Sequence, residues 1–266
     1  VISMEDDPNL IVKEKKGCSM AEGMRRLADG EYDAFVTAGS TGAAVMGSTF
    51  IVKRIKGVRR AALAPIMPSA KNGIMVIDIG ANAECRPEML VQFGLMASIY
   101  MEYAESVDSP KVGLLNIGVE ETKGTPLQLE AYRMLQRAPL NFIGNIEARE
   151  VPSGSCDIIV TDGFSGNIVL KLTEGVALYL FGMVKSAFKA NAKTKLAAAL
   201  MMPQLKQLKK KMDYTEYGGA PLIGISKPVI KAHGSSDANA LKNAVRQAIR
   251  YSESGVISKI EQIMPE

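Results

Sequence analysis

The feature that most constrains the fold is a pattern that recurs five times along the 266 residues: a short apolar run rich in β-branched residues, a turn rich in Gly, Ser or Asn, and then a helical stretch. Strands that alternate with helices are joined by right-handed crossovers, which place helices on both faces of a mostly parallel sheet. The sequence therefore predicts an α/β fold of three layers, α/β/α, with a mostly parallel sheet. The strands are expected at 33–38, 73–78, 111–116, 157–162 and 228–233, with two more at 61–67 and 140–143, and the helices at 43–52, 87–103, 127–137, 238–252 and in a long stretch after 163.

In folds of this kind ligands bind outside the carboxyl ends of the strands, which is where the glycine-rich turns lie. Backbone N–H groups at the start of a helix bind anions without a charged side chain, and Ser, Thr and Asn add donors. The alternative is a tight turn with an N-cap, but three such turns at one edge exceed what the fold needs. We therefore expect a phosphate or phosphorylated ligand, bound by Gly39, Ser40, Thr41 and Gly42, by Gly163, Ser165, Gly166 and Asn167, and by Gly234, Ser235 and Ser236.

Other ways of binding a phosphate lack their motifs here. The chain has neither GxxxxGK[ST] nor GxGxxG after a strand, which disfavours nucleotide hydrolysis and ordinary dinucleotide binding. The segment GFSGN at 163–167 differs from the GxSxG of serine hydrolases. A single histidine excludes a multi-His metal site. Asp78 and Asp162 stand at strand ends, where capping the next turn is a more frequent role than holding a metal, so no metal is expected.

Three side chains are candidates for catalysis. His233 ends a strand just before a glycine turn. It would either shuttle a proton or donate a hydrogen bond to phosphate, or its hydrogen bonds would be purely structural. Lys123 and Lys171 follow turns at the strand ends and would either steady an anion or lie solvated on the surface.

Charge is concentrated in one segment. Residues 189–212 hold seven lysines and no acid, so the other 25 basic residues face 28 acidic ones although the whole chain carries +4. This disfavours a nucleic-acid binder and indicates a local contact with anionic lipid, an acidic carrier protein or a dimer partner. Pro203 is expected to bend or split this helical segment into a projecting hairpin. One stripe carries Met201, Leu205, Leu208 and Met212, and beside it lie Lys206, Lys209 and Lys210.

Three scattered cysteines indicate a reduced, cytoplasmic setting, and no apolar stretch reaches the ~20 residues of a membrane-spanning helix. We therefore expect a cytoplasmic protein.

The turns also carry a family resemblance. Seven motifs occur in order and together resemble the bacterial phosphate acyltransferase family of phospholipid synthesis, called PlsX. The motifs are AGSTGA (38–43), DIGANAEC followed by RPE (78–88), NIGVEETKG (116–124), FIGN (142–145), DGFSGN (162–167), EYGGAPL (216–222) and AHGSS (232–236).

This resemblance implies transfer of a long-chain acyl group from acyl carrier protein to inorganic phosphate, with acyl phosphate as product and no cofactor. It implies a homodimer whose fold is similar to phosphotransacetylase and to the isocitrate and isopropylmalate dehydrogenases. It implies peripheral association with an anionic membrane, where a glycerol-3-phosphate acyltransferase takes the product. Matching positions, including Asp78, Asn82, Asn116 and Asp162, are expected to line the pocket.

One departure and two alternatives accompany the resemblance. The family's opening strand and the glycine-rich turn after it are not in the 266 residues, which are otherwise expected to form one catalytic domain (1–266) with a helical hairpin at 173–214. A metal- and NAD(P)-dependent dehydrogenase on the same fold is one alternative. The other is a non-catalytic scaffold that binds lipid or carrier protein through the hairpin.

Overall fold

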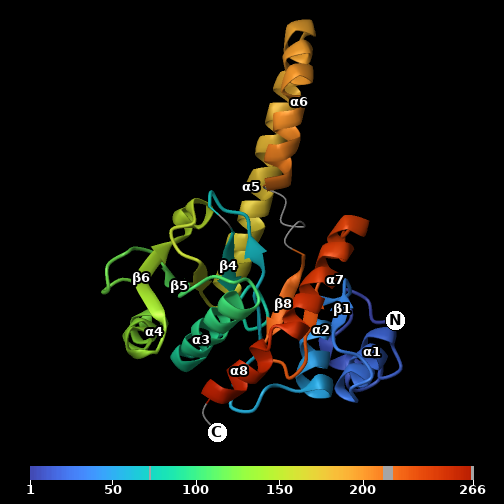
Figure 1. Cartoon of the computed structure of the whole chain (residues 1–266), viewed down its shortest axis with the longest axis vertical. Helices are drawn as coiled ribbons and strands as arrows, with labels where there is room; N and C mark the ends of the chain where they lie inside the picture. Colours follow the sequence, from blue (N-terminus) through green and yellow to red (C-terminus); the bar gives the residue numbers. More distant parts are fainter. Residues whose placement is uncertain (72, 212–217, 265–266) are drawn as a thin grey trace.

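The β-strands form two separate sheets (Figure 1). The structure is a computed structural model that describes residues 1–71, 73–211 and 218–264, with the backbone alone at 209–211. One sheet has the order β1-β9-β8-β2, made of β1 (Phe35–Thr37), β9 (Val229–Lys231), β8 (Ala220–Ile223) and β2 (Ala62–Leu63). The other has the order β3-β4-β7-β5-β6, made of β3 (Ile66–Met67), β4 (Ile74–Ile77), β7 (Ile158–Val160), β5 (Lys111–Asn116) and β6 (Asn141–Glu147).

Among the described residues, four of the seven strand pairings are parallel, as the alternation of strands and helices predicts: β1 with β9, β4 with β7, and β5 with both β6 and β7. The helices are α1 (Ser19–Ala28), α2 (Thr41–Gly47), α3 (Pro87–Tyr103), α4 (Pro126–Arg137), α5 (Gly163–Lys189), α6 (Ala192–Lys211), α7 (Ala238–Glu253) and α8 (Val256–Ile263). Short helices lie at η1 (Pro8–Ile11), η2 (Ser48–Val52) and η3 (Ala148–Ser153).

Helices cover both faces of each sheet. Successive strand residues point to opposite faces, so apolar side chains on both faces pack against helices. On β4, Met75 shares a core with Phe93 of α3, whereas Val76 packs on the other face toward Val169 of α5. On β9, Ile230 lies in the core that holds α7, and Val229 lies in the core that holds α1 and α2. The predicted α/β/α fold class is confirmed, with the sheet divided in two.

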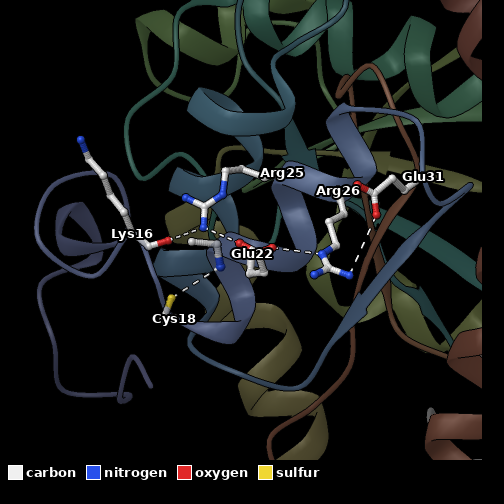
Figure 2. Close-up of polar contacts among 7 residues, drawn as sticks. Lys16, Cys18, Glu22, Arg25, Arg26 and Glu31 are labelled. Carbon is white, nitrogen blue, oxygen red and sulfur yellow. Dashed lines mark hydrogen bonds and ion pairs between the residues drawn. The ribbon is translucent and has the colours of Figure 1, made fainter.

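Helix α1, which was not predicted from the sequence, is stabilised by contacts between residues close in the chain (Figure 2). Its first turn is capped by Cys18, whose Sγ accepts from the backbone N–H of Ala21 at 3.5 Å. Glu22 binds Arg25 at 2.6 Å and Arg26 at 3.0 Å, the spacings at which side chains meet on one helix face. Its apolar face, with Met20, Met24 and Leu27, is buried.

The expected single strand at 61–67 is wrong. Its first half, β2, pairs antiparallel with β8 in one sheet, and its second half, β3, pairs antiparallel with β4 in the other. Pro65 stands between the two halves and has no N–H to donate to a continuous ladder. The chain crosses from one sheet to the other at this point.

Helices α5 and α6 lie against one another and project from the body of the molecule (Figure 1). The turn between them is at 190–191, where Asn191 caps α6 by accepting from the N–H of Thr194 at 3.0 Å. The expectation that Pro203 splits the helix is wrong, since α6 runs without a break from Ala192 to Lys211.

Helix α5 differs from the expectation that no apolar stretch reaches the ~20 residues of a membrane-spanning helix. Its 27 residues are long and apolar enough to cross a membrane by length and composition, and its apolar window is not buried in the described chain.

Candidate functional site

A buried carboxylate organises the loop after β4. Asp78 is fully buried, and its Oδ1 accepts backbone N–H groups from Leu63 at 2.9 Å, Gly80 at 3.3 Å and Ala81 at 3.1 Å. Its Oδ2 accepts from the backbone of Asn82 at 2.7 Å and from the amide side chain of the same residue at 3.0 Å. Burial raises the pKa of Asp78, while these hydrogen bonds oppose the rise. The carboxylate therefore fixes the loop and has its oxygens occupied by the chain itself.

Helix α5 starts directly against this loop. A Cβ on Gly166 would lie 1.9 Å from the carbonyl oxygen of Asp78, and one on Gly163 would lie 2.5 Å from that of Asn82, so both positions require glycine. Asp162 caps the helix by accepting from the N–H of Ser165 at 2.8 Å. Asn167 is the nearest neighbour of Gly80, at 3.9 Å from an added Cβ.

Cys85 lies beside this junction and is not a reactive thiol. Burial, followed by the charge of Asp78, raises the pKa of Cys85 to about 12. A thiol with that pKa stays protonated at neutral pH, so it is a poor nucleophile.

The Gly39–Gly42 turn has structural reasons for its residues. A Cβ on Gly39 would lie 2.6 Å from Met20 of α1, and one on Gly42 would lie 2.5 Å from Pro8 of η1. Ser40 is buried and caps α2, accepting from the N–H of Ala43 at 3.4 Å. Thr41 remains exposed. These contacts explain the glycines without a ligand, so phosphate binding by this turn stays a prediction.

The structure adds a cation that sequence reasoning missed. Lys231 ends β9, opposite Thr37 at the end of β1, and its side chain is only 9% exposed. Its Nζ donates to the carbonyl oxygen of Ala232 at 2.5 Å, and among the described residues it pairs with no Asp or Glu. Burial, with a smaller effect of the positive charge of Lys171, lowers the pKa of Lys231.

Lys231 and Lys171 come from different halves of the molecule, and the charge of Lys171 acts on Lys231. Lys231 belongs to the first sheet, whereas Lys171 is on α5, which begins at the end of β7 in the second sheet. Lys171 itself forms an exposed ion pair with Glu174 at 2.8 Å. A lysine within the apolar run VIKA, two residues before the end of the predicted strand, is the sequence signal that could have identified Lys231.

His233 has a defined tautomer. Its Nδ1 receives the backbone N–H of Ser235 at 3.2 Å and lies 2.7 Å from the hydroxyl of the same residue. Because a backbone N–H only donates, Nδ1 is an acceptor and the neutral ring carries its proton on Nε2. Gly234 follows, and a Cβ there would lie 3.8 Å from the carbonyl oxygen of Ala38, which places this turn beside the end of β1. Ser236 closes the turn, its N–H bonding the carbonyl of His233 at 3.1 Å.

The loop that carries Lys123 is fixed separately. Asn116 donates to the carbonyl oxygen of Lys123 at 3.0 Å, and Asn145 of β6 donates to that of Glu120 at 2.8 Å. These two contacts stay within β5, β6 and their loop. They give Lys123 a defined place but do not join it to Asp78 or Lys231 in the described chain.

The predicted hairpin contacts lie far from this region. Met201 and Leu208 are about half exposed, at 47% and 48%, Leu205 is half-buried and Lys206 is exposed. The side chains of Lys209 and Lys210, and the whole of Met212, lie outside the described residues. No group of three or more His, Cys, Asp or Glu residues able to hold a metal ion occurs in the described part of the chain.

Comparisons with known proteins agree with this α/β architecture. The family described as "Fatty acid synthesis protein" matches residues 1–259. A phosphate acyltransferase of Alkaliphilus oremlandii is 49% identical over 261 residues, which are 98% of this chain and 78% of the relative.

Two solved structures share the fold at low identity. EutD phosphotransacetylase from Staphylococcus aureus has a TM-score of 0.60 and 16% identity over 88% of this chain and 67% of its own. 4-Hydroxythreonine-4-phosphate dehydrogenase from Klebsiella pneumoniae has a TM-score of 0.51 and 9% identity over 88% and 69%. At these identities the likeness is one of fold alone. The family match and the close relative together decide the identity: the chain belongs to this family of phosphate acyltransferases, enzymes of fatty acid and phospholipid synthesis.

Proposed function

We propose that the chain transfers a long-chain acyl group from the thioester of acyl carrier protein to inorganic phosphate and releases acyl phosphate. The observation that carries the proposal is Lys231, a buried cation at a strand end whose described surroundings supply no acid. Burying a charge without a partner is costly, and a bound anion removes that cost. Lys171 lies near enough to contribute a second positive charge.

The chemistry needs no covalent intermediate on the protein. A phosphate oxygen attacks the thioester carbonyl carbon, a C–O bond forms, the C–S bond breaks, and the sulfur leaves as a thiolate that takes up a proton. The protein has to hold the phosphate against the carbonyl and stabilise the oxyanion, which are tasks for fixed donors. His233 fits the role of donor, since its proton is on Nε2, and it would protonate the departing thiolate.

The hairpin supports a proposal about partners and location. Large apolar side chains are exposed along both helices, among them Leu172, Leu178, Tyr179, Leu196 and Leu200. Exposed apolar surface of this extent marks a protein or membrane contact. A second copy of the chain covering α5, and an anionic membrane at the lysine-rich α6, would cover it.

The remaining parts of the proposal follow from this placement. The 266 residues act as one cytoplasmic catalytic domain with peripheral membrane contact, and a membrane-bound glycerol-3-phosphate acyltransferase takes up the product. No cofactor enters the reaction.

A hollow on α5 lies away from the proposed phosphate site. It has a volume of about 510 Å³ and is lined by Tyr179, Gly182, Met183 and Ser186. At ~1.5 Å per helical residue, Tyr179 lies ~24 Å along the helix from Gly163. The hollow therefore belongs to the projecting part of the hairpin and fits the proposed dimer contact.

The test is release of free carrier protein from long-chain acyl carrier protein with and without phosphate, using the full-length protein. We expect release that depends on phosphate and produces a hydroxylamine-reactive acyl phosphate in equal amount. Replacing His233 by Ala is expected to lower kcat about 100-fold, the usual effect of losing a general acid. No phosphate-dependent release by the unaltered protein would reject the proposed function, and unchanged kcat in the variant would reject the role of His233 alone.

A further inference from the structure

A second basic surface lies far from the hairpin in sequence. Residues 53–60, here called the basic segment, read KRIKGVRR and connect η2 to β2. Between Asp33 and Asp78 the sequence contains no acidic residue. The exposed side chains of the basic segment are all cationic: Lys53, Arg54, Lys56, Arg59 and Arg60.

The basic segment is held rigidly. Ile55 and Val58 are buried in the main core, which turns the charged residues outward. The buried side chain of Gln92, on α3, accepts from the N–H of Arg59 at 2.9 Å and donates to the carbonyl of Gly57 at 2.9 Å. The guanidinium of Arg54 donates to the carbonyl oxygen of Arg59. The cations are therefore displayed on a fixed surface.

Lys53 occupies a backbone conformation that normally belongs to glycine, with φ 76° and ψ 157°. Such a conformation costs a non-glycine residue about 1–3 kcal/mol. The structure maintains it through hydrogen bonds on both sides, from the N–H of Lys53 to Ser48 at 2.8 Å and from the N–H of Ser226 to the Lys53 carbonyl at 3.0 Å. Keeping a lysine at this position indicates a use for its charge.

The basic segment also borders the candidate site. Ala61 follows it directly, and the carbonyl of Ala61 accepts from the side chain of Asn82 at 2.8 Å, the same amide that binds Asp78. Arg60 is close enough to Cys85 for its charge to act on that thiol. A molecule docked on the basic segment would therefore lie next to the start of α5.

We propose that the basic segment is the docking surface for the acidic carrier protein that presents the acyl thioester. The proposal rests on the proposed function, because only that reaction requires a protein-bound donor. Charge complementarity speeds encounter and fixes orientation at such surfaces. A membrane is the less fitting occupant, since interfacial binding also needs exposed apolar residues and the segment exposes none. In Figure 1 the light-blue chain of this region lies at the end of the molecule away from the hairpin tip.

The experiment reverses two charges, Arg59→Glu with Arg60→Glu. We expect the KM for acyl carrier protein to rise about tenfold or more, with kcat and the KM for phosphate unchanged, and the dependence of kcat/KM on salt to weaken. The matched control is Lys13→Glu with Lys16→Glu, the same charge change on exposed residues before α1, where Figure 2 shows the Lys16 amine pointing into solvent. The control is expected to leave the KM unchanged.

A donor without the protein part separates docking from chemistry. With an acyl-pantetheine thioester, the Arg59/Arg60 variant is expected to turn over like the unaltered protein, which also shows that it is folded. Three results for the Arg59/Arg60 variant would overturn the docking proposal. They are an unchanged KM for the carrier protein, an equal loss of turnover with acyl-pantetheine, and a loss of vesicle binding alone. No phosphate-dependent release by the unaltered protein rejects the proposed function instead. A second variant, Lys53→Gly, relaxes the backbone while removing one charge, and it is expected to raise both the thermal midpoint and the KM for the carrier protein.

Discussion

A buried lysine costs stability in the empty protein, and at the residue scale Lys231 offers the sharpest test of the proposed phosphate site. Replacing Lys231 by Met removes a charge and keeps most of the volume. We expect the KM for phosphate to rise about tenfold or more, because hydrogen bonds to charged groups contribute about 1.5–3 kcal/mol. Phosphate is also expected to raise the thermal midpoint of the unaltered protein more than that of the variant. Equal phosphate effects on both would show that Lys231 does not meet the anion.

The same substitution has a pH signature. The pKa of Lys231 is lowered in the folded chain from its ordinary value of 10.5, so the unfolded chain binds more protons between the two values. This lysine therefore makes unfolding free energy rise with pH in that interval. Without phosphate, Lys231→Met is expected to be more stable than the unaltered protein at pH 7, and the difference should narrow toward pH 10. Urea unfolding at both pH values measures this difference in unfolding free energy. A difference that stays the same at pH 7 and pH 10 would contradict the lowered pKa of Lys231.

At the scale of elements, the packing of α5 on the Asp78 loop is what sets the site. Gly166→Ala would place a Cβ 1.9 Å from the carbonyl oxygen of Asp78, and backbone there has little room to shift. We expect a loss of unfolding free energy of about 3 kcal/mol or more. Gly175→Ala, on the same helix with nothing within 4 Å, is the control and is expected to gain about 0.5–1 kcal/mol. Urea unfolding measures the unfolding free energy of both variants. Similar values would show that α5 is not tightly packed on the Asp78 loop.

Elements with a strong local pattern could be predicted from the sequence, and those shaped by distant contacts could not. Helix α3 begins at Pro87 and ends at Tyr103, and β5 spans Lys111–Asn116, both as expected. Strand β8 was missed because Pro221 and the glycines beside it resemble a turn, and it is a strand because β2 and β9 pair with it. Helix α1 was missed because Gly23 weakens its pattern. That glycine is needed where a Cβ would meet the ring of Phe35 at 2.4 Å.

The candidate site was predictable in outline only. The sequence places polar turns at strand ends, and the structure joins two of them, Asp78–Asn82 and Gly163–Asn167, in direct contact. Sequence spacing does not show burial. The hydrogen bonds that occupy the Asp78 carboxylate, and the burial of Lys231 without a described acidic partner, therefore become visible only in the assembled fold.

At the scale of the whole molecule, charge is divided between two ends. The sequence indicates one basic patch, in the hairpin, whereas the fold displays a second one at 53–60 because Ile55 and Val58 are drawn into the core. If both proposals hold, these two separate surfaces would let the protein bind a membrane and a carrier protein at the same time. This division predicts that changes in the hairpin and changes in the basic segment affect different measurements.

The hairpin is tested by Leu205→Glu with Leu208→Glu on α6. Placing two carboxylates on its apolar stripe is expected to weaken binding to anionic vesicles about tenfold or more, since burying each leucine contributes about 1.5–3 kcal/mol, while turnover with soluble substrates stays largely intact. The control, Gln204→Glu with Gln207→Glu, adds the same charge at exposed neighbouring positions and is expected to retain most of the vesicle binding. Sedimentation of both variants is measured in parallel. If the leucine variant becomes monomeric, the stripe is the dimer interface, and membrane contact has to be assigned to another part of the hairpin.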